Sequence, residues 1–362
     1  MHIQADGLTD YICEIFTAAG CSPAESRRIA ENLVDANLTG HDSHGVIRTP
    51  RYLKWLTEEK LLPDRDISVV SESDGLVILD GNYGFGQTVG PLAVERGIAK
   101  ARAHGVAIVA LRHAGHLGRV GAFAETAAAH NQVSIHFVNV AGSVLVAPFG
   151  GTDRRMSTAP VAIGMPARDG QHVILDFATS LVAEGKILVA AKGGKKLPDG
   201  SLVGPNGEMS ADPALLYGEA DPAVTPDDRR GPGAMTAMGA HKGSGLALMC
   251  ELLAGALTGS GATGPDYPRV YNGMLSIYMA VDRFDTDDAY ADELKRFITY
   301  VKSSNPVTPD GEVLMPGEPE QRTREQRLKE GLPFADDAWA VIVAAGESVG
   351  VKAMEGSAIA RN

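Results

Sequence analysis

Short β-rich runs alternate with Ala-rich stretches between residues 73 and 282, and this alternation constrains the fold more than any other feature. The runs predicted as strands are 76–80, 106–111, 133–138, 160–165, 172–176 and 273–281. The stretches 88–104 and 117–130 between them are predicted as helices. Such alternation is typical of an α/β domain, in which helices pack on a sheet.

The two ends of the chain have helical patterns instead. Ser22-Pro23-Ala24-Glu25 has the form of a capping box with proline at the first helical position. Thr49-Pro50 predicts a second helix start, with the helix continuing through Trp55. Further helices are expected at 287–302, 318–330 and 337–358. We expect 1–72 and 283–362 to form one helical domain, with 73–282 as an α/β domain inserted between them.

Two segments of the α/β part stand out by composition. Residues 193–235 are rich in Gly, Pro and Asp with little periodicity, which predicts a long excursion on the surface. Residues 244–258 are apolar almost all round, which predicts a fully buried helix.

Charge and cysteine content exclude several classes of protein. Lys and Arg number 33 against 45 Asp and Glu, a net charge of −12, which argues against nucleic acid or an anionic membrane as partner. No stretch approaches the roughly 18–20 apolar residues of a membrane span, and the N-terminus lacks the pattern of a signal peptide. Three unpatterned cysteines make neither a disulfide framework nor a zinc site. A cytoplasmic globular protein is expected.

The segment His41-Asp42-Ser43-His44-Gly45 precedes Arg48 and Tyr52 at steps of four. On one continuous helix, His44, Arg48 and Tyr52 would share a face, although Pro50 prefers a first turn. An Arg fork suits a carboxylate, and a His or Tyr beside it could move protons. A polar corner between two helices is the alternative interpretation.

A second histidine loop, His113 to Gly121, follows a predicted strand and precedes a predicted helix. Ligands of open α/β folds lie at such strand ends, and His116 or His113 could act as acid or base there. The glycine spacing is G-x-x-G-x-x-G, and a tight turn with surface histidines remains the alternative. Both histidine loops contain H-x-x-H, but the spacing indicates no third ligand, so no metal site is expected.

Glycine-rich matches to a dinucleotide fingerprint fail on context. Gly259 to Gly264 fits G-x-G-x-x-G but follows a helix and precedes no convincing one. Gly84-Phe85-Gly86 lies between a strand and a helix, yet the next strand lacks an acidic residue for the ribose. A Rossmann domain is therefore not predicted.

Three further segments could bind a ligand or serve only as structure. Asp176 to Ser180 ends a strand, as a ribose site or as a helix cap. His241-Lys242 opens a helix, as a phosphate site or as a flexible glycine entry. Met315 to Glu318 precedes a helix whose arginines could meet a 2′-phosphate or form a solvated face.

Taken together, GHDSHGVIRTPRYL, AGHLGRVGAFAE, VAPFGGTDRR, DFATS, HKGSGLALMCELLAGALTG and PGE, in this order, resemble the type 2 malate/L-lactate dehydrogenase family over essentially the whole chain. The resemblance implies a non-Rossmann α/β cofactor domain, a helical domain from both chain ends, and a homodimer or dimer-based oligomer. Two departures concern the pocket. Ser244 stands where the family usually has Tyr or Phe, and Ala114-Gly115 where many relatives have Ser-Asn.

The resemblance also implies an activity and the residues that carry it. The activity is NAD(P)-dependent dehydrogenation of a 2-hydroxycarboxylate, with hydride passing between NAD or NADP and a small 2-oxo or 2-hydroxy acid. His116 would be the acid/base and Arg48 would bind the carboxylate, while Ser43, His44 and Tyr52 would line the pocket. The cofactor residues would be His44, Gly118, Arg119, Val120, Asp176, Phe177, Ala178, Thr179, Ser180, His241, Lys242, Asn272, Met315, Pro316, Gly317 and Glu318.

Three other functions remain open. Reduction of a cyclic ketimine, such as piperideine- or pyrroline-2-carboxylate, would use the same pocket groups. A metal-dependent hydrolase or lyase would use the paired H-x-x-H loops. A non-catalytic protein on a dehydrogenase fold would bind the cofactor without turnover.

Overall fold

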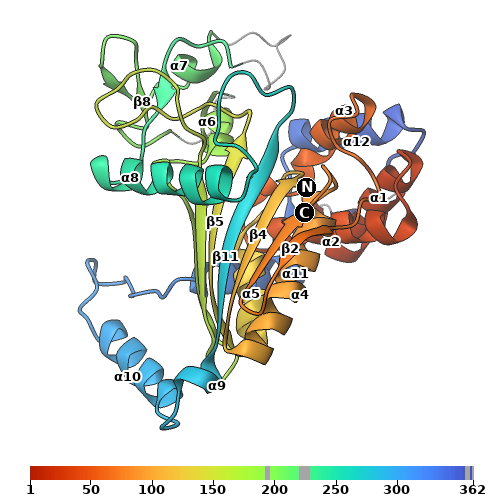
Figure 1. The fold of residues 1–362 in the computed structure, drawn as a ribbon. Coiled ribbons are helices and arrows are strands. Elements are labelled where there is room, and N and C mark those ends of the chain that lie inside the picture. Colours follow the sequence, from red (N-terminus) through yellow and green to blue (C-terminus); the bar gives the residue numbers. More distant parts are fainter. Residues whose placement is uncertain (192–195, 220–228, 355–358, 361–362) are drawn as a thin grey trace.

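The computed structural model describes residues 1–191, 196–219, 229–354 and 359–360. In this part of the chain, a seven-stranded sheet has the order β2-β3-β4-β11-β5-β6-β7. Its strands are β2 (Ser68–Glu72), β3 (Leu76–Asp80), β4 (Val106–Ala114), β5 (Gln132–Ala141), β6 (Pro160–Met165), β7 (Val173–Ala178) and β11 (Tyr271–Ala280). Figure 1 shows them running through the middle of the molecule.

The pairing of these strands differs from that of a doubly wound sheet, in which the strands are mostly parallel. Of the pairs described, only β3 and β4 run parallel, and the others are antiparallel. Strand β11 comes from far along the sequence and inserts between β4 and β5. All predicted strands are confirmed within a few residues, and β2 was missed. Because all five residues of β2 are exposed at the sheet edge, no alternation marks it in the sequence.

Two helices cover one face of the sheet. Helices α4 (Gly86–His104) and α5 (Gly121–Ala129) bury Val94 and Phe123 against Leu111 and Val138 in one core. The predicted helix 117–130 begins only at Gly121, because residues 115–120 form a loop. This loop carries His116, so the shortened helix places the histidine at the end of β4.

The predicted burial of 244–258 is wrong. Helix α8 (His241–Cys250) continues into a π-helix, η3 (Glu251–Leu257), on the opposite face of the sheet. Ala247, Cys250 and Ala254 are fully buried. Leu248, Met249, Leu252 and Leu257, on the outer side, are 45% to 68% exposed. The described residues cover only one side of this helix, so the apolar side chains on its other side stay exposed in this part of the chain.

The two chain ends lie side by side, as Figure 1 shows. Helices α1 (Ala5–Ala18), α2 (Pro23–Leu38), α3 (Thr49–Thr57) and α12 (Asp336–Ser348) share a core that includes Phe16, Leu33, Tyr52 and Ile342. Strand β1 (His2–Ile3) pairs with β12 (Leu332–Pro333) and β13 (Ile359–Ala360). The domain boundaries at 72 and 282 stay a prediction.

Not all of the C-terminal part joins this core. Helix α11 (Glu318–Glu330) contacts α2, whereas α9 (Val281–Phe284) and α10 (Tyr290–Lys302) follow β11 at the other end of the sheet. Helix α10 has no buried residue and shares a cavity with the loop after β6. Helix α12 ends at Ser348, where Val351 N–H bonds back to Gly346, so the predicted helix is wrong over 349–354. Residues 355–358 of that prediction lie outside the described residues.

The predicted excursion at 193–235 is partly wrong. After α6 (Glu184–Ala191), a small sheet forms from β8 (Leu202–Val203), β9 (Met209–Ser210) and β10 (Ala234–Met235), with α7 (Ala214–Tyr217) beside it. Leu202, Leu216 and Met235 are fully buried and pack with Leu145 and Ile187. Residues 192–195 and 220–228 of that prediction lie outside the described residues.

Candidate active site

The segment that carries Ser43, His44 and Arg48 is not a continuous helix. Two short 3₁₀ turns, Asp42–His44 and Val46–Arg48, precede α3. The Asn37 side chain holds the bend, because its Oδ1 accepts from Val46 N–H at 2.9 Å. A Cβ at Gly45 would stand 2.1 Å from Asn37 Oδ1, so only glycine fits there. Pro50 lies in the first turn of α3 as predicted, while Thr49 lies inside the helix and does not cap it.

The glutamate of the Ser22 capping box also has another role. Ser22 Oγ accepts from Glu25 N–H at 3.3 Å, which confirms the helix start. The Glu25 carboxylate accepts instead from Asp64 N–H at 2.5 Å and Thr88 Oγ1 at 2.8 Å. It therefore ties α2 to the start of α4, close to His116.

His44, Tyr52 and His116 meet in spite of the interrupted helix. Tyr52 Oη lies 2.7 Å from His116 Nδ1. The imidazole rings of His44 and His116 are stacked, with centroids 5.6 Å apart. His44 Nδ1 lies 3.2 Å from Ser43 Oγ. Both histidines are half-buried and Tyr52 is 1% exposed, so its hydroxyl reaches a ligand only through His116. The role of Tyr52 in lining a substrate pocket, which the resemblance implies, stays a prediction.

Close backbone packing fixes the loop that carries His116. A Cβ at Gly86 would stand 2.3 Å from the His116 carbonyl oxygen, and one at Gly115 would stand 2.5 Å from that of Gly84. Asn272 Oδ1 accepts from Leu117 N–H at 2.9 Å, which anchors the next residue of the loop to β11. Glycine at 86 and 115 therefore lets the start of α4 approach the histidine.

Arg48 lies beside this pair and is half-buried. Its Nε donates to the Ser43 carbonyl oxygen at 2.6 Å. Within the described part of the chain, no hydrogen bond engages its two terminal nitrogens, so both remain available for a carboxylate. Glu184 on α6 attracts Arg48 and forms an ion pair with Arg229 at 2.6 Å. Helix α6 comes this close because Gly185 has no side chain to meet Ser43.

Burial and positive neighbours set the protonation of these groups. The pKa of His116 is held well below its ordinary value by burial and by Arg48, His44 and Arg51. Burial and Arg48 lower the pKa of His44 to about 3. Burial raises the pKa of Tyr52 to about 12, against the opposite effect of Arg48. At neutral pH the site holds two neutral imidazoles and a protonated phenol.

The segments predicted to bind a cofactor lie along strand β7. Ile174 N–H donates to the Pro316 carbonyl oxygen at 3.0 Å, which brings Met315–Glu318 to the start of the strand. Met238 N–H donates to the Thr179 carbonyl oxygen at 2.9 Å, which brings His241 and Lys242 to its end. Asp176 Oδ2 accepts from Gly121 N–H at 2.8 Å and so connects the strand to the His116 loop. β7 is an edge strand, so these segments form a line along the rim of the sheet.

Several of the predicted cofactor side chains are engaged within the protein. Arg119 is 3% exposed and forms ion pairs with Asp35 at 2.9 Å and Glu125 at 2.7 Å. Asn272 Nδ2 donates to the Asn139 carbonyl oxygen, Thr179 Oγ1 to that of Thr158, and Ser180 Oγ to that of Val182. The hydrogen-bonding groups of these side chains are therefore already engaged by other residues of the protein.

The arginines of α11 are also paired. Arg322 pairs with Glu312, Arg324 with Asp35 at 2.6 Å, and Arg327 with Asp42 at 2.6 Å. Their charges are balanced by carboxylates, which favours the structural interpretation of this helix over a 2′-phosphate site.

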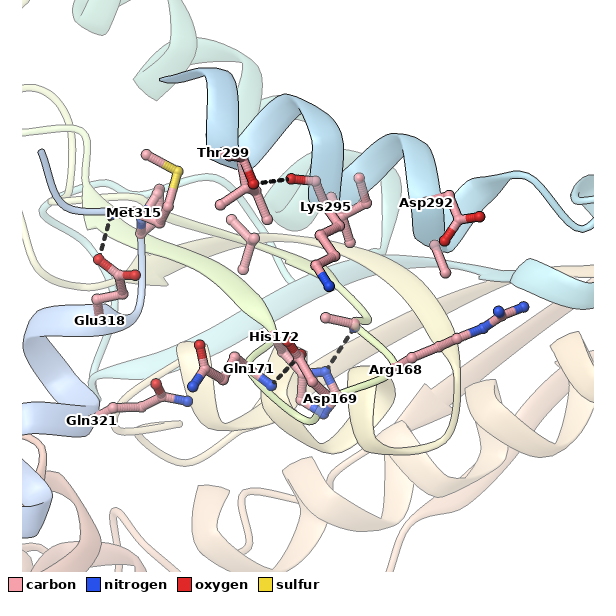
Figure 2. A pocket seen from close by; sticks show the side chains of 16 residues that line it. Arg168, Asp169, Gln171, His172, Asp292, Lys295, Thr299, Met315, Glu318 and Gln321 are labelled. Atoms are coloured by element: carbon pink, nitrogen blue, oxygen red, sulfur yellow. Dashed lines mark hydrogen bonds between the residues drawn. The ribbon is translucent and has the colours of Figure 1, made fainter. Parts of the chain in front are cut away.

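A cavity of about 270 Å³ lies between α10, the loop after β6 and Met315–Glu318. Val173, Leu294, Ile298, Met315 and Pro316 give it apolar walls. Figure 2 shows Lys295 reaching from α10 toward the loop that carries Asp169 and His172. Polar and charged side chains complete the lining, among them Arg168, Asp169, His172 and Lys295.

Sequence reasoning missed two polar groups of the site. Gln87, at the start of α4, lies 3.1 Å from Tyr52 Oη and 3.2 Å from the His116 carbonyl oxygen. Glu184 pairs with Arg229 beside Arg48. Gln87 directly follows the glycine pair Gly84 and Gly86, which was the available signal. Nothing in the sequence near Glu184 indicated its place.

In the described ranges, no group of three or more His, Cys, Asp or Glu residues could hold a metal ion. Nor does any helix there have the length and apolar character needed to cross a membrane.

Comparison with known proteins gives consistent matches over most of the chain. The malate/L-lactate dehydrogenase family model matches residues 3–343. Hydroxycarboxylate dehydrogenase B of Escherichia coli K12 is 37% identical over 355 residues, which cover 96% of this chain and 94% of the relative. The structure of sulfolactate dehydrogenase from Methanocaldococcus jannaschii is 30% identical with a TM-score of 0.83, covering 97% of this chain and 98% of that one. Δ1-Piperideine-2-carboxylate reductase from Pseudomonas syringae is 28% identical with a TM-score of 0.79, covering 95% and 99%.

Proposed function

Because this chain belongs to the malate/L-lactate dehydrogenase family of oxidoreductases, we propose that it is an NAD(P)-dependent dehydrogenase of a small 2-hydroxycarboxylic acid. One observation carries the proposal. His116, backed by Tyr52 at 2.7 Å, lies in the same half-buried cluster as Arg48, whose terminal nitrogens are not engaged in the described part of the chain. A proton-transfer group beside a carboxylate-binding group is what a 2-oxo acid requires.

Arg48 binds the substrate carboxylate through Nη1 and Nη2, while its Nε stays on the Ser43 carbonyl oxygen. His116 supplies the proton to the carbonyl oxygen in reduction and takes it from the hydroxyl in oxidation. His44 and Ser43 belong to the same cluster beside His116. A bound nicotinamide coenzyme supplies the hydride in one direction and accepts it in the other.

Three segments along the edge strand β7 would hold the coenzyme in this proposal: Asp176–Ser180, His241 with Lys242, and Met315–Glu318. The cavity beside Met315, with apolar and charged walls, would offer room for part of it. The α/β part is then a non-Rossmann cofactor domain and the joined chain ends are the helical domain. The exposed apolar side of α8 and η3 supports a homodimer or dimer-based oligomer.

A panel assay tests the function. NADH and NADPH absorbance would be followed separately with glyoxylate, pyruvate, oxaloacetate, phenylpyruvate and hydroxypyruvate. We expect oxidation of one coenzyme by at least one of these acids. Binding of both coenzymes without any turnover would instead support the binding-only alternative.

Reduction of a cyclic ketimine is a second candidate, and it rests on the similarity to the piperideine-2-carboxylate reductase structure. Such an imine also carries a carboxylate beside its electrophilic carbon, so Arg48 and His116 would serve it in the same way. Adding Δ1-piperideine-2-carboxylate to the panel separates the two. Faster turnover of the imine than of every oxo acid would make it the substrate class.

A further inference from the structure

We propose that the proton delivered by His116 is replaced from Tyr52 in the same step, and that Gln87 is the positioning residue of this relay. The inference rests on the proposed function and concerns its proton path.

Gln87 has a fixed orientation at the start of α4. It is 2% exposed, and its Nε2 lies 3.1 Å from Tyr52 Oη and 3.2 Å from the His116 carbonyl oxygen. An amide nitrogen carries two hydrogens and only donates, so each hydrogen has one acceptor. The reversed amide would place Oε1 against the His116 carbonyl oxygen, two acceptors in contact. Tyr52 Oη therefore accepts a hydrogen bond from Gln87.

This donor determines where the Tyr52 proton goes. A phenol has one hydrogen, and Tyr52 Oη already accepts from Gln87. His116 Nδ1, at 2.7 Å, is the remaining partner of this buried hydroxyl among the described residues. Tyr52 thus donates to Nδ1, and a neutral His116 carries its own hydrogen on Nε2, the nitrogen left for the substrate.

The charges around the pair favour a relay over a cationic histidine. Arg48, Arg51 and His44 face His116, and with burial they disfavour an imidazolium by lowering the pKa of His116. Arg48, Arg51 and Gln87 face Tyr52 and act to lower its pKa against burial. Glu184 faces Arg48 from α6. The same positive groups that oppose an imidazolium stabilise a phenolate.

In the direction of reduction, one hydride and two protons move in this step. Hydride adds to C2 of the substrate, and the π electrons of the carbonyl move to its oxygen. That oxygen takes the proton of His116 Nε2 while Nδ1 takes the proton of Tyr52 Oη. The Tyr52 O–H electron pair stays on the phenolate oxygen, which accepts from Gln87. The phenolate recovers a proton from water after the product leaves, and oxidation runs in reverse.

The pH dependence of single-turnover hydride transfer tests the relay. In the natural protein we expect a rate that is flat between about pH 6 and 8, since neutral His116 and protonated Tyr52 are both fully populated. In Tyr52→Phe the proton must come from imidazolium, so the rate should fall about tenfold for each pH unit. If the natural protein shows that same fall, the relay is overturned.

Gln87→Met removes the donor while keeping the size of the side chain. We expect hydride transfer at pH 7 to slow by about 10- to 100-fold, the effect of losing a hydrogen bond to a charged group. In the Tyr52→Phe background the same change should alter the rate less than about twofold. An equal loss in both backgrounds would show a purely structural role. Gln132→Met is the matched control, because Gln132 is also 2% exposed and donates to the Ile98 carbonyl oxygen away from the site.

Two measurements separate the outcomes. The ¹⁵N NMR signals of His116 in the resting protein should show hydrogen on Nε2, and hydrogen on Nδ1 would overturn the relay whatever the activity. Coenzyme affinity, measured by fluorescence, should agree within about twofold among the variants. Absence of turnover in the natural protein would remove the proposed function and the relay together, whereas turnover with a shared pH profile would remove the relay alone.

Discussion

Arg48 and Ser43 are joined by a hydrogen bond of 2.6 Å from the guanidinium Nε to the Ser43 carbonyl oxygen. This bond crosses the two 3₁₀ turns and directs the guanidinium toward the His44–His116 pair, where its charge lowers the pKa of both histidines. The turn that interrupts the helix is therefore also the support of the carboxylate-binding group.

Arg48→Lys should raise KM for the acid substrate about 10- to 100-fold with a smaller change in kcat. An ammonium cannot keep the bond to Ser43 and also grip a carboxylate through two parallel hydrogen bonds. Initial rates at saturating coenzyme measure this. Arg155→Lys, at an exposed surface pair, is the control. An unchanged KM for every acid tested would remove Arg48 from the substrate site.

His116→Asn should lower kcat about 10²- to 10⁴-fold, the usual contribution of a positioned acid/base group, with coenzyme affinity within about threefold. The matched control is His113→Asn, at the end of strand β4 just before the loop. The His113 ring pairs with Asp80 at 3.0 Å, and its φ of 51° suits asparagine. A His116 variant that turns over within about threefold of the natural protein would show that another group moves the proton.

Particular residues show how much of the candidate site could be predicted from the sequence. The spacing of four residues from His44 to Arg48 and Tyr52 correctly suggested one cluster, although the continuous helix behind that argument does not exist. Tyr52 reaches His116 because α3 restarts at Thr49 and packs against Phe16 and Phe85. The motif indicated which groups meet, and long-range packing decided how.

Other features depend on contacts that no local pattern records. Gln87 meets Tyr52 from 35 positions away, so its role appears only once α4 packs beside α3. The position of β11 between β4 and β5 is equally non-local. Helix α8 could not be placed for a different reason. Its residues are apolar on all sides, so the pattern does not indicate which side packs against the sheet.

Gly86→Ala should reduce kcat strongly and destabilise the fold. The added methyl group would stand 2.3 Å from the His116 carbonyl oxygen and 2.7 Å from Leu117 Cα, and both are backbone atoms that cannot move aside cheaply. A cost of about 1–3 kcal/mol is typical of such overpacking. Thermal unfolding and steady-state rates measure the two effects. Gly75→Ala, with no atom within 4 Å, should leave both nearly unchanged. Equal behaviour of the two variants would show that the loop adapts.

His136 should make the protein less stable as the pH falls. It is fully buried between Ser276 Oγ at 2.8 Å and Ser134 Oγ at 3.0 Å, and burial lowers its pKa to about 3. The unfolded chain binds a proton near pH 6.5 while the folded chain stays neutral, so stability is complete above that pH and declines below it, down to about pH 3.

The size of this effect follows from linkage. Between pH 6.5 and 5 the natural protein should lose about 2 kcal/mol more than His136→Asn, because one proton-binding site is suppressed by folding. Urea unfolding at the two pH values measures the difference, and His104→Asn on the exposed end of α4 should behave like the natural protein. Equal pH slopes for the natural protein and His136→Asn would mean that His136 becomes protonated without unfolding, which its burial between two serines opposes.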